Sequence, residues 1–82
     1  MIQELKSSKK RIVGLKQTVK AIKDNRVKKV YIAKDADEYI KQSVLDVCSQ
    51  SKVEIVYVDT MKELGEACGI EINASAAALP ND

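Results

Sequence analysis

The sequence contains no histidine, tryptophan or phenylalanine, and aromatic residues make up only 4% of it. Without histidine the chain cannot form a Ser-His or Cys-His catalytic pair, and with no cysteine cluster it also lacks the usual zinc ligands. We therefore expect no metal site, no cofactor and no enzymatic activity. The three tyrosines are too dispersed along the chain to form a stacking platform.

Only two cysteines are present, Cys48 and Cys68, and neither belongs to a CxxC pair. Both lie among apolar residues in segments with helical periodicity. We expect small buried hydrophobic side chains in a reducing compartment, and not a disulfide or a redox site.

Long hydrophobic runs are also missing. No stretch is long enough to cross a membrane, and no apolar leader precedes a small-residue cleavage site. We therefore expect a cytoplasmic protein without a membrane partner. The 82 residues are 45% hydrophobic and 32% charged, which is typical of a single soluble domain with a modest core. We expect one domain over 1–82, with its core at about 12–79 and a frayed tail at 80–82.

Charge is unevenly distributed. The net charge of only +2 does not by itself indicate a nucleic-acid-binding protein. Basic residues crowd the first third of the chain, however, and acidic residues dominate after Lys34. This asymmetry indicates an anionic partner on one side, although a solvated basic face is the commoner meaning of a lysine cluster.

Hydrophobic periodicity predicts alternating helices and strands. The expected helices cover approximately 1–8, 15–23, 38–48 and 61–68, and the expected strands 12–13, 30–33, 53–58 and 74–79. This order predicts an α/β fold, a three-layer α/β/α sandwich around a small mixed, largely parallel four-stranded sheet. The alanines of the last segment favour a helix by propensity, but the position of the segment favours a strand.

Local signals mark the helix boundaries. Asp37 is predicted to cap the helix that follows it, and Thr60 with Glu63 has the spacing of a capping box. Gly65 lowers the helix propensity of its segment, which indicates a close approach to another backbone. Gly69 has the position of a helix-terminating glycine.

The stretch Gly14–Lys20 leads from a short strand into an amphipathic helix. A helix N-terminus attracts anions, and lysine and glutamine side chains suit phosphates and base edges. The stretch is not a P-loop, because Val19 and Ala21 flank Lys20 where that motif requires glycine and Ser/Thr. The loop Ile70–Asn73 follows a helix, yet it could fold onto the sheet edge where Gly14 lies.

An enzymatic alternative rests on Asp35 and Asp37, a DxD pair after a predicted strand. Haloacid dehalogenase-type phosphatases use such a pair as nucleophile and magnesium ligands. Tyr39 replaces their usual Thr or Val, and no downstream acidic pair follows. A turn-and-cap role is the more economical interpretation.

Three blocks in order resemble the kink-turn RNA-binding ribosomal protein family, and in particular its short bacterial YbxF-type members. These blocks are Gly14-Leu-Lys-Gln-Thr-Val-Lys20, Tyr31-Ile-Ala-Lys-Asp-Ala-Asp37 and Leu64-Gly-Glu-Ala-Cys-Gly-Ile-Glu-Ile72. The resemblance covers roughly Ile12 to Leu79. It implies an α/β/α sandwich that binds a sharply bent RNA element with tandem sheared G·A pairs, without catalysis.

The resemblance also implies roles for the first block. Gly14 would let the RNA backbone approach, Lys16 and Gln17 would face guanine edges, and Lys20 would support a guanine or a phosphate. Many family members have Asn-Glu where this chain has Lys16-Gln17. Lysine only donates hydrogen bonds, so it can reach guanine O6 and N7 but cannot accept from an amino group.

In the other two blocks, Asp37 matches an acidic residue that in some members contacts a flipped-out base. Ile70, Glu71 and Ile72 match a loop that covers unstacked nucleotides with apolar side chains. The alternative for the two isoleucines is a loop packed on the core.

The sequence thus predicts a monomeric RNA-binding protein whose target is a kink-turn in ribosomal RNA, a riboswitch or another noncoding RNA, with the ribosome as a further partner. The rival is a protein-interaction or ribosome-assembly module of the same fold that does not read RNA directly.

Overall fold

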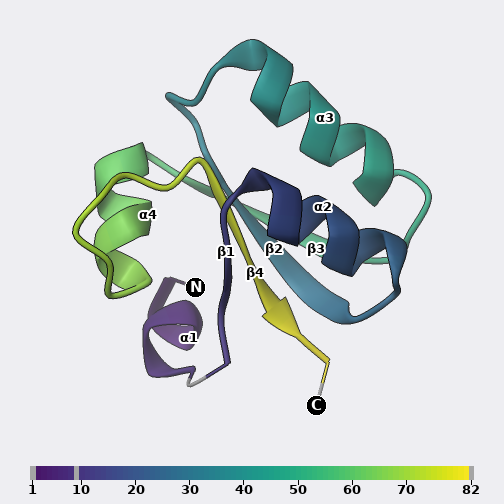
Figure 1. Cartoon of the computed structure of the whole chain (residues 1–82), viewed down its shortest axis with the longest axis horizontal. Coiled ribbons are helices and arrows are strands. Elements are labelled where there is room, and N and C mark those ends of the chain that lie inside the picture. Colours follow the sequence, from purple (N-terminus) through teal and green to yellow (C-terminus); the bar gives the residue numbers. More distant parts are fainter. Residues whose placement is uncertain (1, 9, 82) are drawn as a thin grey trace.

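The structure is a computed structural model that describes residues 2–8 and 10–81. Helices and strands alternate along the chain (Figure 1). The elements are α1 (Ile2–Ser7), β1 (Ile12–Val13), α2 (Leu15–Lys23), β2 (Val27–Ala33), α3 (Glu38–Cys48), β3 (Glu54–Val58), α4 (Met61–Ala67) and β4 (Ala76–Pro80). The predicted element order is confirmed, including a strand made mostly of alanine at the end.

The four strands form one mixed sheet in the order β1-β4-β2-β3. β2 and β3 pair in parallel, whereas β4 pairs antiparallel with both β1 and β2. The expectation of a largely parallel sheet is therefore wrong for two of these pairings. The cause lies in the loop before β4: the Ala74 amide donates to the Met61 carbonyl at the start of α4. The chain has thus returned to the edge where β3 ended, and β4 must run back across the sheet.

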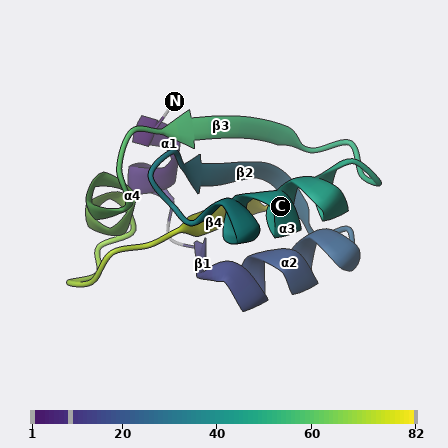
Figure 2. The ribbon, with the colours of Figure 1, turned by 90° about the horizontal axis from the view of Figure 1, so that it is seen from above.

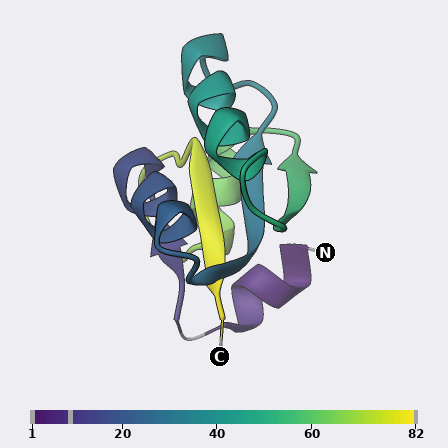
Figure 3. The same cartoon turned by 90° about the vertical axis from the view of Figure 1, so that its right-hand side faces the viewer.

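Helices cover both faces of the sheet, as the predicted sandwich requires. Figure 2 and Figure 3 show α2 and α3 on one face and α1 and α4 on the other. Alternate residues of β2 serve the two sides, because successive strand side chains point to opposite faces. Val30 and Ile32 pack under α2 and α3, while Tyr31 and Ala33 belong to the core under α1 and α4.

The alanines of β4 explain how so small a sheet supports two helical layers. Ala76, Ala77 and Ala78 are fully buried in the middle of the sheet. Their short side chains let α2 approach the sheet closely on one side and α4 on the other. Tertiary packing thus overrides the helix propensity of alanine.

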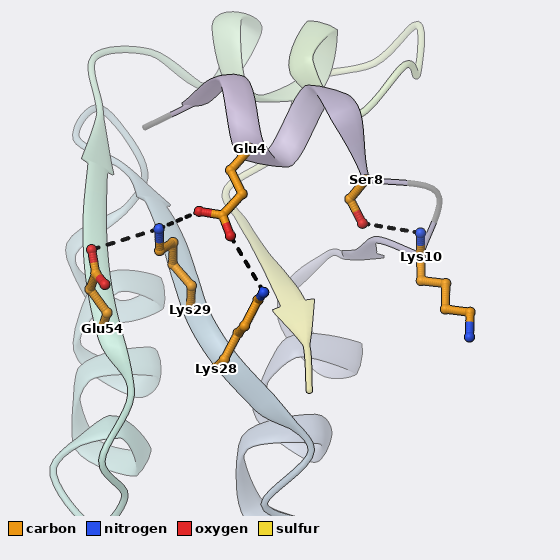
Figure 4. A network of polar contacts seen from close by, with 6 residues as sticks. All are labelled: Glu4, Ser8, Lys10, Lys28, Lys29 and Glu54. Carbon is orange, nitrogen blue, oxygen red and sulfur yellow. Dashed lines mark hydrogen bonds and ion pairs between the residues drawn. The ribbon is translucent and has the colours of Figure 1, made fainter. Parts of the chain in front are cut away.

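Helix α1 is held to the sheet by apolar packing and by charge. Leu5 is fully buried in the core. Glu4 Oε1 lies 2.5 Å from Lys29 Nζ, and Glu4 Oε2 lies 3.5 Å from Lys28 Nζ (Figure 4). The hydrogen bond from Lys29 lowers the pKa of Glu4 and raises the pKa of Lys29. The predicted N-terminal helix is confirmed over Ile2–Ser7, and Met1 lies outside the described residues.

The expected frayed tail is more ordered than the sequence indicated. Pro80 is the last residue of β4. The Asn81 amide donates to the Arg26 carbonyl at 2.7 Å, and its side-chain nitrogen donates to the Asn25 carbonyl at 3.0 Å. These bonds tie the chain to the turn after α2, and Asp82 lies outside the described residues.

Both cysteines are free and buried, as predicted. Burial raises the pKa of the Cys48 and Cys68 thiols, which keeps them protonated and unreactive at neutral pH. No helix within residues 2–8 and 10–81 combines the length and the apolarity that a bilayer crossing requires.

Candidate functional site

The segments singled out from the sequence meet at one edge of the sheet, where β1, β2 and β3 end and β4 begins. The Gly14 amide donates to the Ala76 carbonyl at 2.9 Å, and the Ala33 amide donates to the Ser75 carbonyl at 3.0 Å. The start of α2 is therefore bonded directly to the strand that follows the loop 70–73. The loop 70–73 runs beside α4 and the chain returns to this edge at Ala74, whose amide donates to the Met61 carbonyl. A position of the loop itself beside Gly14 stays a prediction.

The start of α2 is left open. Its N-cap residue, Gly14, has φ +97° and ψ 159°, a backbone conformation that residues other than glycine rarely adopt. No side chain caps this end and no acidic residue lies in its first turn. The first hydrogen bond within the helix runs from Thr18 N to Gly14 O at 3.0 Å. The amides of residues 15–17 therefore have no acceptor within the helix. A Cβ at Gly14 would meet nothing within 4 Å, so the surface there is open.

The side chains of this first turn divide into an outer and an inner set. Lys16, Gln17 and Lys20 are exposed, and neither lysine forms an ion pair with any described residue. Thr18 faces inward and is fully buried, and its Oγ1 has no hydrogen-bond partner among the described residues. No pattern in the sequence indicated this buried hydroxyl, because threonine is common on exposed helix faces as well.

The starts of α3 and α4 lie at the same edge but are capped from within. Asp37 Oδ1 accepts from the Tyr39 amide at 2.8 Å, which confirms the predicted cap of α3. Thr60 Oγ1 accepts from the Glu63 amide at 3.0 Å and caps α4. Asp35 Oδ1 accepts from the Met61 amide at 2.8 Å. Both carboxylates of the DxD pair thus accept hydrogen bonds from amides at the starts of helices, as the turn-and-cap interpretation predicts.

A metal centre receives no support from this edge. Within the described ranges, no group of three or more Cys, Asp or Glu side chains is arranged to hold a metal ion. Lys34 Nζ lies 3.2 Å from Asp59 Oδ1, so a lysine ammonium already occupies the space beside that carboxylate.

The loop between α4 and β4 crosses the backbone of α4. A Cβ at Gly65 would overlap the carbonyl oxygen of Ile72, so only glycine fits there. This confirms the predicted close approach. Gly69 has φ +75°, which ends α4 and starts the loop. The fold therefore fixes the position of the loop through α4 itself.

The two isoleucines of this loop lie in different environments. Ile70 is half-buried and packs against the core on the α1 and α4 side. Ile72 is 73% exposed, and Glu71 between them is also exposed. For Ile70 the core-packing alternative holds, whereas Ile72 presents a large apolar surface to solvent. Together they line a shallow hollow with Lys62, Glu66 and Asn73.

Comparison with known proteins identifies the class. The chain belongs to the ribosomal protein L7Ae/L30e/S12e/Gadd45 family, whose model matches residues 1–82. An RNA-binding protein of Caldanaerobacter subterraneus subsp. tengcongensis is 51% identical over 69 residues, which cover 84% of each chain. The RNA-binding protein YbxF of Geobacillus stearothermophilus is 38% identical over 68 residues, or 83% of each chain. The resemblance drawn from three sequence blocks is confirmed.

Solved structures share the fold at lower identity. A protein of unknown function from Bacillus halodurans C superposes with a TM-score of 0.84 and 22% identity, covering 98% of this chain and 80% of the other. The 15.5kD RNA binding protein of Giardia lamblia superposes with a TM-score of 0.80 and 23% identity, covering 99% and 68%. At these identities the likeness establishes the fold.

Proposed function

We propose that this protein binds RNA and recognises the kink-turn, a sharply bent element with tandem sheared G·A pairs. Related chains of the same family and similar length are named RNA-binding proteins. The observation that carries the proposal is the bond between the Gly14 amide and the Ala76 carbonyl. It joins an open, basic helix start to the strand behind an exposed apolar loop, so one ligand can contact both.

The start of α2 supplies the polar half of the proposed surface. Open space over Gly14 admits an RNA backbone. The amides of residues 15–17 and the positive end of the helix dipole favour its phosphates. Lys16 and Gln17 reach the edges of guanines, with Lys16 restricted to the acceptors O6 and N7. Lys20, one turn further on, supports a guanine or a phosphate.

The loop and the start of α3 supply the other half. Ile72 offers its exposed side chain to the face of an unstacked base, with Ile70 and Glu71 completing that part of the surface. Asp37 uses Oδ1 for the cap of α3, and its second carboxylate oxygen is left to accept from a flipped-out base. This division of labour lets a single residue hold a helix and contact RNA.

Binding to RNAs that differ only in the tandem G·A pairs tests the proposal. Titration of a kink-turn RNA, and of the same RNA with those pairs changed to Watson–Crick pairs, yields two dissociation constants. We expect a preference of at least about 100-fold for the bent RNA, because a protein favours one conformer only through differential affinity. Equal affinity would overturn the proposal. One protein per RNA in the same titration supports a monomer.

Association with ribosomes is the second part of the proposal, with kink-turns of ribosomal RNA as the target. Its rival is docking on a ribosome-assembly protein through the same basic face. Cosedimentation of ribosomes with the wild type and with a Lys16, Gln17 and Lys20 triple alanine variant separates them. We expect the variant to dissociate, and retention of the variant would favour protein docking.

A further inference from the structure

A groove runs along the outer surface between α2 and α3, away from the loop 70–73. The two helices pack side by side on one face of the sheet (Figure 1, Figure 3). The floor of the groove is apolar and half-buried, formed by Leu15 and Val19 of α2. Its walls carry Lys16, Lys20 and Lys23 from α2 and Tyr39 from α3.

The groove carries positive charge that favours an anionic ligand. The three lysines follow one side of α2, and none of them pairs with an acidic side chain among the described residues. Among the described residues, the acidic side chain that lines the groove is Asp24. Its Oδ2 lies 3.8 Å from Arg26 Nε, so Asp24 is paired with Arg26 and not with a groove lysine.

Tyr39 gives the groove a flat aromatic surface. Tyr39 is 77% exposed, although large aromatic side chains usually bury most of their ring. The cap bond from its amide to Asp37 fixes its backbone at the start of α3. An exposed aromatic ring beside unpaired lysines is the combination that binds single-stranded nucleotides, through stacking and phosphate contacts.

We propose that the groove between α2 and α3 binds an unpaired nucleotide of the RNA, with its base stacked on Tyr39 and its phosphate held by Lys20 and Lys23. The inference rests on the proposed function and extends it. Lys16 and Lys20 belong both to the start of α2 and to the groove, so the two surfaces are continuous. An RNA held at Gly14 can therefore pass directly along α2, which favours RNA over an acidic protein segment as the occupant.

The test compares two RNAs, a kink-turn with short blunt stems and the same RNA with single-stranded flanks of about ten uridines at its stem ends. Such flanks can reach any face of a molecule measuring 30 × 29 × 19 Å. We expect the wild type to bind the flanked RNA about tenfold more tightly than the blunt RNA. Tyr39→Ala should abolish this gain, and Tyr39→Phe, which keeps the ring, should retain most of it.

The lysine arm measures the phosphate contact. Lys23→Ala should reduce the slope of log K against log salt for the flanked RNA by about one, while leaving binding of the blunt RNA within about twofold. Lys6→Ala is the matched control, because Lys6 is an exposed residue of α1. Helix α1 lies on the opposite face of the sheet from α2 and α3 (Figure 2). Thermal unfolding within about 4 °C of the wild type verifies that these surface variants are folded.

The outcomes separate the two proposals. If Tyr39→Ala and Lys23→Ala bind flanked RNA like the wild type while the preference for G·A pairs persists, the groove proposal is wrong and an acidic partner protein becomes its better occupant. If the G·A preference is absent but Tyr39→Ala still weakens binding of flanked RNA, the groove proposal stands and kink-turn recognition fails.

Discussion

Three helices begin at the same edge of the sheet, and one of them differs from the other two. The starts of α3 and α4 are capped by Asp37 and Thr60, and each has an acidic residue in its first turn. The start of α2 has a glycine without a cap bond, and lysine where the others have acid. Glycine in place of an Asp or Thr cap costs roughly a few tenths of a kcal/mol, so the start of α2 is slightly less stable than it would be with such a cap.

The difference between the three helix starts supports the proposed RNA contact at α2. At α3 and α4, side-chain oxygens of the chain itself occupy the amides that a phosphate would need. At α2 the positive end of the helix dipole is left for a partner.

The largest expected effect comes from making α2 resemble its neighbours. Lys16→Glu places an acid in the first turn, where the helix dipole favours it, and should raise the free energy of unfolding by about 0.5 kcal/mol. The same change should weaken kink-turn binding about 100-fold, because a guanine contact is lost and a repulsive charge is added. Denaturant unfolding and RNA titration measure the two effects.

Lys52→Glu is the control for this change. It alters the net charge equally, but Lys52 is exposed just before β3, at the opposite end of the strand from the site. An equal loss of RNA affinity in both variants would mean that overall charge, and not the open helix start, determines binding.

The next effect separates the two isoleucines of the loop. Ile72→Ala should leave the free energy of unfolding within about 0.5 kcal/mol of the wild type. It should weaken RNA binding about tenfold, since an exposed side chain that becomes buried against a base contributes about 1.5 kcal/mol. Ile70→Ala should instead lower the free energy of unfolding by about 1–2 kcal/mol, because the half-buried Ile70 side chain packs on the core. Similar stability losses in both variants would contradict the different burial of the two residues.

The smallest effect tests the double use of Asp37. Asp37→Ala should lower the free energy of unfolding by about 1 kcal/mol through loss of the cap on the Tyr39 amide, and Asp37→Ser should restore most of it. Both variants should bind RNA more weakly, because both lack the second carboxylate oxygen. RNA affinity that follows stability across the two variants would show that Asp37 is a cap alone.

The sequence predicted those structural features that depend on residues close together along the chain. The caps at Asp37 and Thr60 follow from residue type and spacing, and the backbone contact at Gly65 follows from a glycine inside a helix. The resemblance in three blocks supplied the family. Neither route predicted the direction of β4, which is set by the bond between the Ala74 amide and the Met61 carbonyl across the loop.

The site was also predicted only in part. Sequence placed Ile70 and Ile72 together, but residues two apart in an irregular loop need not share an environment, and one of them packs on the core. Tyr39 was set aside because the tyrosines are scattered along the chain. Its place beside three lysines arises from the packing of α2 against α3, which no local pattern encodes.

The most direct test of the open helix start is amide hydrogen exchange, measured residue by residue with and without a kink-turn RNA. We predict that the amides of Leu15, Lys16 and Gln17 exchange readily in the free protein and become protected in the complex, together with that of Ile72. The capped Glu63 amide should change little. Tight RNA binding without protection at residues 15–17 would contradict the account.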